Sequence, residues 1–316
     1  MKKKTLSIVI PCYNEEETLT HSYTVVSDLC YRWKNDGLLA DYELFFVNDG
    51  SGDKTLEILK DVYSKDNHVN FLDLRKNVGF QGAITAGMFE STGDIVVTID
   101  ADLQDEPKKI EEMIYKHYEG FEMVLGVRNN RNSDPFFKRV FAQTYYKILG
   151  KIGVISVYNH ADFRLMSREI INELKKFPER VRYLRSLIFE IEPNYTCVYY
   201  DRTPRKLGLS KFTFSKSFSL AVDGITSFTS RPIRLLSILG IIMFGISIIG
   251  GVTVLLGKFY WHLGIPGWAS LAIIVLFFGG IQNFSVGVVG EYVAKIYIEN
   301  KQRPLYLVRN TYRHKK

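Results

Sequence analysis

Residues 95–105 read IVVTIDADLQD, a short apolar and β-branched run followed by a turn with three carboxylates. The run from Ile95 to Ile99 is typical of a buried β-strand. Asp100 and Asp102 follow it directly, so two carboxylates one residue apart would lie just past the end of a strand. Such a pair can hold a hard divalent cation directly or through water and leave other positions for phosphate oxygens.

Strand patterns of this kind alternate with helical patterns along the first half of the chain. Strands are expected at 5–10, 43–47, 69–74, 95–99 and 123–127, and helices from about 15, at 53–63, at 79–90 and at 107–118. The alternation predicts βαβ units, and hence an α/β domain with a mainly parallel, Rossmann-like sheet and helices on both faces. Ligands of such sheets bind at the carboxyl ends of the strands.

The turns after three of the expected strands are acidic. They are residues 11–15 (PCYNE), 48–53 (NDGSGD) and 100–105 (DADLQD). We expect Asp53 to act partly as a helix N-cap, but capping does not explain three such turns at one edge of a sheet. The first strand is not followed by GxGxxG, and GxxxxGK[ST] does not occur, which disfavours a dinucleotide site and a nucleoside triphosphatase.

Two stretches near the C-terminus are long and apolar enough to span a membrane. Residues 233–256 and 271–293 contain a single charged residue each, and about 20 apolar residues make a spanning helix. We therefore predict two transmembrane helices within 232–293, joined by a short extracytoplasmic loop at 257–270. A pair of buried core helices is the alternative, but core helices of this length are seldom apolar on every side.

The segments that flank these spans are basic or amphipathic. The tail 294–316 carries seven Lys or Arg, so the positive-inside rule places the tail and a large domain at 1–211 in the cytoplasm. Residues 212–231 repeat aromatic and aliphatic residues at helical spacing, which predicts an amphipathic helix in the membrane interface. Residues 136–149 have a similar pattern, which a helix packed on the domain's own core explains about as well.

The composition is that of a globular protein, not of a disordered or disulfide-rich chain. Of 316 residues, 46% are hydrophobic and 24% are charged, with a net charge of +7. Cys12, Cys30 and Cys197 are far apart and lack metal-ligand spacing, so we expect free thiols in a reducing compartment. No nucleic-acid recognition motif accompanies the basic charge, and no nucleic-acid partner is expected.

Several motifs in the same order resemble the family 2 inverting glycosyltransferases. They are 9–15 (VIPCYNE), 47–51 (VNDGS) with Asp53 and Thr55, and 99–104 (IDADLQ) with Pro107. Others are similar to the polyprenyl-phosphate branch, which contains dolichyl-phosphate mannose synthase and the bactoprenol (undecaprenyl-phosphate) glucosyltransferases. These are 126–128 (GVR), 161–165 (ADFRL), 202–211 (RTPRKLGLSK), 290–292 (GEY) leading to Arg303-Pro304, and the two C-terminal spans. The resemblance covers essentially the whole chain.

The resemblance implies a nucleotide-diphospho-sugar transferase fold and an inverting transfer of a hexose from a UDP-sugar to undecaprenyl phosphate. Glucose is the sugar that it favours, and N-acetylglucosamine and galactose stay open. It implies Mg²⁺ or Mn²⁺ as cofactor and the bacterial inner (cytoplasmic) membrane as location, with both termini cytoplasmic. It also implies a role in cell-envelope glycosylation, a lipid bilayer as partner and a homo-oligomer, which relatives suggest is a tetramer.

The resemblance also assigns the donor side of the site. The uracil and ribose would be cradled by residues at the ends of the first two strands: Pro11, Tyr13, Glu15 and Asp49. Asp100 would belong to the same nucleotide-binding site. Asp100, Asp102 and Gln104 would lie around the divalent ion on the diphosphate. Asp102 would thereby act in catalysis, because an ion held there stabilises the charge that builds on the leaving group.

The acceptor side is assigned in the same way. The lipid phosphate would be received by Arg128, Arg139, Arg202, Ser210 and Lys211, although a solvated surface charge is the alternative for each basic residue. Asp162 would occupy the position of the base. Because a phosphate monoester has a second pKa of about 6 and is largely ionised near pH 7, we expect Asp162 to position the acceptor or neutralise positive charge as much as it abstracts a proton.

Two other functions stay open. A processive polysaccharide synthase shares the nucleotide-binding half, but such enzymes carry a QxxRW motif, which does not occur in this sequence. A non-enzymatic membrane adaptor could bind anionic lipid through basic residues, but it would not need the acidic turns. Metal-dependent binding of UDP would separate the adaptor from the enzyme.

Overall fold

The computed structural model describes residues 3–129, 157, 159–180, 182, 184–202, 231–261 and 267–314. The chain divides into two compact units. The first comprises Met1–Ala221 together with Arg303–Lys316, and the second comprises Val222–Gln302.

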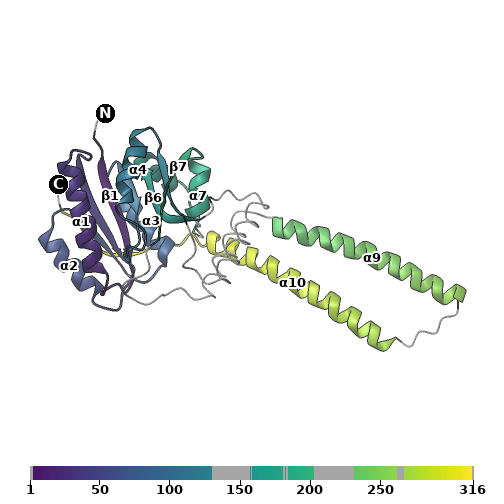
Figure 1. The fold of residues 1–316 in the computed structure, drawn as a ribbon. Coiled ribbons are helices and arrows are strands. Elements are labelled where there is room, and N and C mark those ends of the chain that lie inside the picture. Colours follow the sequence, from purple (N-terminus) through teal and green to yellow (C-terminus); the bar gives the residue numbers. More distant parts are fainter. Residues whose placement is uncertain are drawn as a thin grey trace. The chain divides into compact units, whose positions relative to one another are not determined.

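The first unit is built on an eight-stranded sheet with the strand order β7-β5-β6-β4-β1-β2-β3-β8 (Figure 1). The strands are β1 (Thr5–Cys12), β2 (Asp41–Asn48), β3 (Val69–Leu74), β4 (Ile95–Thr98), β5 (Met123–Arg128), β6 (His160–Ser167), β7 (Tyr195–Tyr200) and β8 (Val308–Tyr312). The helices of this unit are α1 (Leu19–Asn35), α2 (Thr55–Lys65), α3 (Phe80–Glu90), α4 (Lys109–Tyr118), α6 (Arg168–Lys175) and α7 (Leu184–Ile191).

The pairing directions make the sheet mixed. β1 pairs in parallel with β2 and β4, β2 with β3, and β5 with β7. β6, however, runs antiparallel to both of its neighbours, β4 and β5, and β8 runs antiparallel to β3. The expectation of a mainly parallel, Rossmann-like sheet is therefore corrected for the half of the sheet that follows β4. The first five predicted strands are confirmed, whereas β6, β7 and β8 were not assigned as strands.

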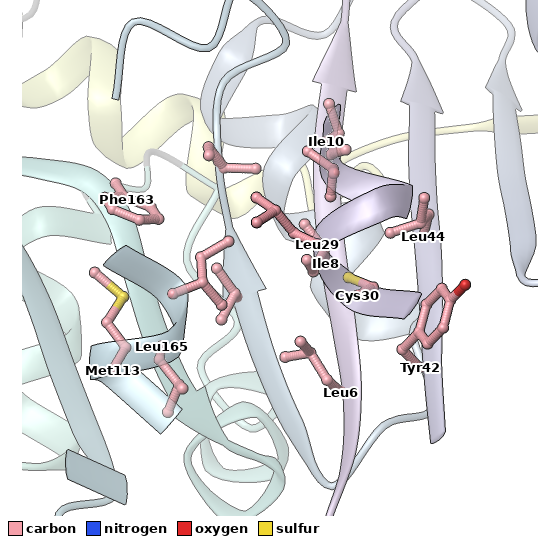
Figure 2. Close-up of a cluster of buried hydrophobic side chains, with 14 of the residues drawn as sticks. Leu6, Ile8, Ile10, Leu29, Cys30, Tyr42, Leu44, Met113, Phe163 and Leu165 are labelled. Atoms are coloured by element: carbon pink, nitrogen blue, oxygen red, sulfur yellow. The ribbon is translucent and has the colours of Figure 1, made fainter. Parts of the chain in front are cut away.

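Helices cover both faces of the sheet, as predicted. On one face, α1, α2 and α4 bury apolar side chains against alternate residues of the strands. Figure 2 shows this cluster, with labelled members that include Leu6, Ile8 and Ile10 of β1, Leu29 of α1 and Met113 of α4. Fully burying such a side chain contributes about 1.5–3 kcal/mol, so this cluster fixes the strands whose ends form the site.

The sequence of α4 shows why these helices form. Its buried residues, Ile110, Met113 and Ile114, recur at helical spacing on one face. Acidic residues in its first turn and basic residues in its last turn complement the helix dipole. α3 packs on the opposite face of the sheet, where a Cβ added at Gly87 would come 2.9 Å from Val47. A glycine at this position lets the helix approach β1 and β2 closely.

The second unit contains the helices α9 (Arg231–Trp261) and α10 (Trp268–Asn300). In the part of the chain that the structure describes, no helix is long and apolar enough to cross a membrane. The two transmembrane helices expected from the sequence are thus not confirmed. The expected interfacial helices at 136–149 and 212–231 lie outside the described residues, except for Arg231, and the division into segments at 211, 231 and 293 stays a prediction.

Candidate active site

Three turns meet at the edge of the sheet where the parallel strands end. Cys12 of β1 pairs with Asn48 of β2, and Val9 of β1 pairs with Thr98 of β4 on the other side. The turns that follow these strands are therefore neighbours, with the first turn (13–16) between the second turn (48–53) and the third turn (99–105). The three acidic segments found in the sequence lie together, as their strand positions predicted.

The first and second turns are joined by hydrogen bonds. The backbone amide of Asn14 donates to Ser51 Oγ at 3.0 Å, and the amide of Gly52 donates to Asn14 Oδ1 at 2.8 Å. Asn14 has a φ of 53°, a left-handed conformation that asparagine tolerates better than most residues. Glu15 donates its amide to Thr55 Oγ1 at 2.9 Å, so the start of α2 also anchors the first turn.

Asp49 lies at the centre of the second turn and is buried. Its carboxylate accepts hydrogen bonds from the backbone amides of Val78, at 2.7 Å, and Gly79, at 3.1 Å. Burial raises the pKa of Asp49 to about 6, although these two amides oppose the shift. The second turn is thereby tied to the segment between β3 and α3.

The first two nucleotide-site candidates differ from each other in exposure. Pro11 is buried within β1, whereas Tyr13 is 41% exposed just beyond the end of that strand. An exposed aromatic ring beside two polar turns is a suitable surface for stacking a planar base. The positions of Pro11, Tyr13, Glu15 and Asp49 around the first two turns are compatible with the nucleotide role expected for them.

The third turn carries Asp100 and Asp102. Leu103 donates its amide to the carbonyl of Asp100 at 3.2 Å and has a φ of 48°, and the amide of Gln104 donates to Asp102 Oδ1 at 3.2 Å. Burial, together with the charges of Asp105 and Asp102, raises the pKa of Asp100 to about 8.

These carboxylates fit a hard divalent cation. The charges of Asp105, Asp102 and Asp162 all disfavour ionisation of Asp100, which a bound cation would offset, and carboxylate and amide oxygens are the ligands that Mg²⁺ and Mn²⁺ prefer. Among the described residues, no three His, Cys, Asp or Glu side chains are arranged to hold a metal ion by themselves. An ion at Asp100, Asp102 and Gln104 would therefore need further oxygen ligands from water or a phosphate.

Asp162 faces the third turn because β6 is antiparallel. Thr98 of β4 pairs with Arg164 of β6, and Thr98 Oγ1 donates to the carbonyl of Asp162 at 2.5 Å. Continuing this register sets Asp162 opposite Asp100, on the same face of the sheet. The charge of Asp162 accordingly contributes to the raised pKa of Asp100.

Both carboxylate oxygens of Asp162 are held by arginines. Oδ1 accepts from Arg164, whose side chain is only 1% exposed, and Oδ2 accepts from Arg185 Nη2 at 2.8 Å and Nε at 3.2 Å. Burial alone would raise the pKa of Asp162, but Arg185 and Arg164 hold it well below its ordinary range. Arg164 also donates to the carbonyl of Leu184 at 3.3 Å, which fixes the start of α7 next to Arg185.

A second charged cluster closes the other side of the third turn. Arg128, at the end of β5, donates to Asp105 Oδ1 at 3.0 Å, and the Tyr200 hydroxyl donates to the same oxygen at 2.6 Å. Arg202 Nη2 donates to Gln104 Oε1 at 2.6 Å. The guanidinium groups of Arg128 and Arg202 therefore contact the third turn directly.

The predicted site residues are thus partly brought together. Those on the donor side line the three turns, and Asp162, Arg128 and Arg202 surround the third turn. Arg139, Ser210 and Lys211 lie outside the described residues.

Sequence reasoning left Asp105, Tyr200, Arg164 and Arg185 without a role, although Asp105 had been noted beside Asp102 and Arg164 belongs to the ADFRL motif. Arg185 had no sequence signal, because its partner lies 23 positions away.

Comparison with known proteins shows the family of this chain. Residues 7–175 match the family model described as glycosyl transferase family 2. A bactoprenol glucosyl transferase of Shigella phage SfX is 36% identical over 306 residues, covering 96% of this chain and 99% of the relative. An uncharacterized glycosyltransferase of Bacillus subtilis, YkoT, is 40% identical over 310 residues, covering 96% of this chain and 90% of the relative.

One solved structure shares the fold over most of the chain. A mannosyltransferase from Pyrobaculum calidifontis, PcManGT, determined with GDP-Man and Mn²⁺, superposes with a TM-score of 0.50 at 14% identity, covering 95% of this chain and 87% of the other. The sheet is thus the mixed α/β sheet of nucleotide-sugar transferases. The chain belongs to glycosyltransferase family 2, and it is a glycosyltransferase.

Proposed function

We propose that this enzyme transfers glucose from UDP-glucose to undecaprenyl phosphate and forms a lipid-phosphate-linked sugar for the cell envelope. The observation that carries the proposal is the similarity to the phage bactoprenol glucosyl transferase, which extends through 96% of the chain and includes its C-terminal part. A relative that shared the catalytic unit alone would support sugar transfer but not the acceptor.

The donor would bind across the first and second turns. Tyr13 offers an exposed ring for the uracil, and the carboxylate of Asp49 offers an acceptor for the ribose hydroxyls. The hydrogen bonds between the two turns hold these groups in place before the donor arrives. Binding then costs little ordering of the protein.

A Mg²⁺ or Mn²⁺ ion would be held by Asp100, Asp102 and Gln104, where it supplies positive charge to the diphosphate leaving group. Asp100 is partly buried there, and the charges of Asp105 and Asp102 act on it. Asp105 is neutralised separately, by Arg128 and the Tyr200 hydroxyl. Asp100 and Asp102 are the carboxylates that we assign to the ion.

The acceptor phosphate would approach from the side of Asp162. Attack by its oxygen on the anomeric carbon, opposite the departing diphosphate, inverts the configuration and gives a β-linked product from an α-linked donor. A carboxylate with both oxygens engaged by guanidinium groups is a weak base. We therefore assign Asp162 a positioning role toward Arg185 and the acceptor, and the already ionised phosphate needs no strong base.

The acceptor is a lipid, so the enzyme would work at a membrane. The apolar stretches 233–256 and 271–293 support two transmembrane helices, and the basic tail supports a cytoplasmic position for both termini. This arrangement would place the catalytic unit on the side where nucleotide sugars are made. We propose the bacterial inner membrane as its location, and a homo-oligomer as its assembly.

The test is transfer to undecaprenyl phosphate by the full-length protein purified in detergent. The donors would be UDP-glucose, UDP-N-acetylglucosamine and UDP-galactose, each with Mg²⁺, with Mn²⁺ and with a chelator. We expect metal-dependent product from UDP-glucose, and loss of at least about a hundredfold in kcat for Asp102→Asn. Glu112→Gln is the matched control, because Glu112 is an exposed carboxylate that pairs with Lys109 on α4.

Each other outcome changes the proposal in a defined way. Product from a different UDP-sugar would keep the reaction and replace the sugar. UDP binding with metal but without transfer to undecaprenyl phosphate would overturn the acceptor. Failure of UDP to bind in the presence of metal would overturn the donor, and a polymeric product would favour a processive synthase.

A further inference from the structure

The catalytic sheet is completed by a strand from the far end of the chain. β8 pairs antiparallel with the edge strand β3, with Tyr312 opposite Phe71 and Asn310 opposite Asp73. The ring of Tyr312 stacks on that of Phe71 at 4.1 Å, and His314 stacks on Tyr63 at 4.0 Å. β8 therefore has a fixed register on β3, although residues 222–302 separate it from the rest of its unit.

This register brings Arg309 to the end of β3. Its guanidinium lies 3.5 Å from Asp73 Oδ2 and donates to the carbonyl of Arg75 at 3.3 Å. Arg75 in turn binds the backbone carbonyls of Leu307 and Val308. Asp73 is 3% exposed at its side chain, so Arg309 compensates a carboxylate that has little access to water.

Asp73 is also linked to the second turn, through Asn48. Its Oδ1 accepts from Asn48 Nδ2 at 2.8 Å, in a buried hydrogen bond. Asn48 Oδ1 then accepts from the backbone amide of Ser51 at 3.2 Å, and Ser51 Oγ accepts from the amide of Asn14 at 3.0 Å. An unbroken series of contacts thus joins the C-terminal strand to the two turns at which the donor nucleotide would bind.

The orientation of Asn48 depends on Asp73. An amide side chain can turn over, which would exchange its donor and acceptor ends. A carboxylate at Asp73 accepts only, so it holds the Nδ2 end of Asn48 toward itself and leaves Oδ1 for Ser51. With Arg309 in place, the carboxylate of Asp73 keeps its position.

We propose that Arg309 is a positioning residue for donor binding, acting through Asp73 and Asn48 on the second turn. The inference rests on the proposed function for the identity of the donor, a UDP-sugar. Arg309 touches neither donor nor acceptor in this arrangement. Its loss loosens the second turn and weakens nucleotide binding, while the acceptor side, on the far side of β1 and β4, is unaffected.

The test uses the full-length enzyme with Arg309→Gln. We expect the Kd for UDP with Mn²⁺, and the KM for UDP-glucose, to rise about three- to fivefold, as the loss of a partly exposed ion pair allows. The KM for undecaprenyl phosphate and kcat at saturating donor stay unchanged. Arg313→Gln is the matched control, because Arg313 lies just past β8 and donates to the carbonyl of Glu90, away from Asp73.

A double-mutant cycle with Asp73→Asn tests the route. Asp73→Asn removes the charge that Arg309 contacts, so adding Arg309→Gln to it should change the Kd for UDP by less than about 1.5-fold. An equal effect of Arg309→Gln with and without Asp73→Asn would overturn the proposal. So would a Kd in Arg309→Gln no different from that of Arg313→Gln.

The outcomes separate this inference from the proposed function. If the unaltered enzyme does not bind UDP, the proposed function has failed. If it binds UDP and Arg309→Gln binds it equally well, only the role of Arg309 has failed. In a third outcome, Arg309→Gln and Arg313→Gln lower the thermal midpoint equally and lower the affinity for UDP equally. That result would mean that β8 acts on stability alone, and it would overturn the positioning role.

Discussion

Replacing Asp162 with asparagine should destabilise the catalytic unit as well as slow the reaction. The carboxylate lies between Arg164, which is 1% exposed, and Arg185, which is 29% exposed. Asp162→Asn keeps the size of the side chain but removes the negative charge that the buried guanidinium of Arg164 contacts. Removing one member of a buried ion pair costs about 3–5 kcal/mol, and the exposed partner adds little to that figure.

Thermal unfolding of the full-length protein in detergent measures this cost. A loss of about 3 kcal/mol corresponds to a fall of roughly 6–12 °C in Tm for a unit of this size. Arg164→Met removes the buried charge and replaces it with an apolar side chain of similar length. The double variant should therefore lose less than the sum of the two single variants, by about 1.5 kcal/mol or more.

Additive stability losses in Asp162→Asn and Arg164→Met would refute this account of Asp162. If the losses of the two single variants sum within about 0.5 kcal/mol, the two side chains are not coupled and the ion pair does not hold the site together. Glu112→Gln serves as the control, since an exposed pair such as Lys109 and Glu112 contributes at most about 1 kcal/mol. In the same samples, an activity loss in Asp162→Asn that grows below pH 6 would point to ionisation of the acceptor phosphate.

Three further changes have defined outcomes. Burial raises the pKa of Asp49 to about 6 in the folded protein, so the free energy of unfolding should fall as pH rises from about 4 to 6. Asp49→Asn should make this fall smaller in denaturant titrations. An equal fall in the variant would contradict the burial argument. Gly87→Ala should lower Tm despite the better helix propensity of alanine, because its Cβ would overlap Val9. Tyr200→Phe should cost about 1–3 kcal/mol in thermal unfolding, since Asp105 loses a buried donor; no change in Tm would show that water replaces the hydroxyl.

The first half of the fold could be predicted from the sequence because its signals are local. The strand from Ile95 to Ile99 and the helix that follows Pro107 each carry their own periodicity, and the structure has β4 and α4 there. Parallel strands end at one edge, so the placement of Asp49 and Asp100 at the same edge of the sheet followed from the βαβ pattern. Local pattern and sheet topology were sufficient for the donor side.

The rest of the sheet depends on contacts between residues far apart in the sequence, which local patterns do not predict. β8 reads VRNTY and is exposed over most of its length, so it has no apolar alternation to reveal it. It becomes a strand because the open edge of β3 offers unpaired backbone groups and because Phe71 offers a ring for Tyr312. Its basic residues entered the sequence reasoning only through the positive-inside rule, which gives no secondary structure for the tail.

The antiparallel direction of β6 explains why the acceptor side was the harder part to predict. In a parallel strand, residues at its start lie at the edge opposite the site. Asp162 is near the start of β6, yet it reaches Asp100 because β6 runs against β4. The register between Thr98 and Arg164 also directs Arg164 and Asp162 to the same face, where they meet Arg185 from α7.

The same geometry limits what Asp162 can do. A general base needs an oxygen free to accept a proton, whereas both oxygens of Asp162 bind guanidinium groups and its pKa is held low. An acceptor that arrives as a phosphate anion does not require a base, but it does require positive charge held at a fixed place. Strand direction, ion pairing and the ionisation of the acceptor thus point to one role: Asp162 holds the guanidinium of Arg185 at a fixed place, where its positive charge can serve the acceptor phosphate.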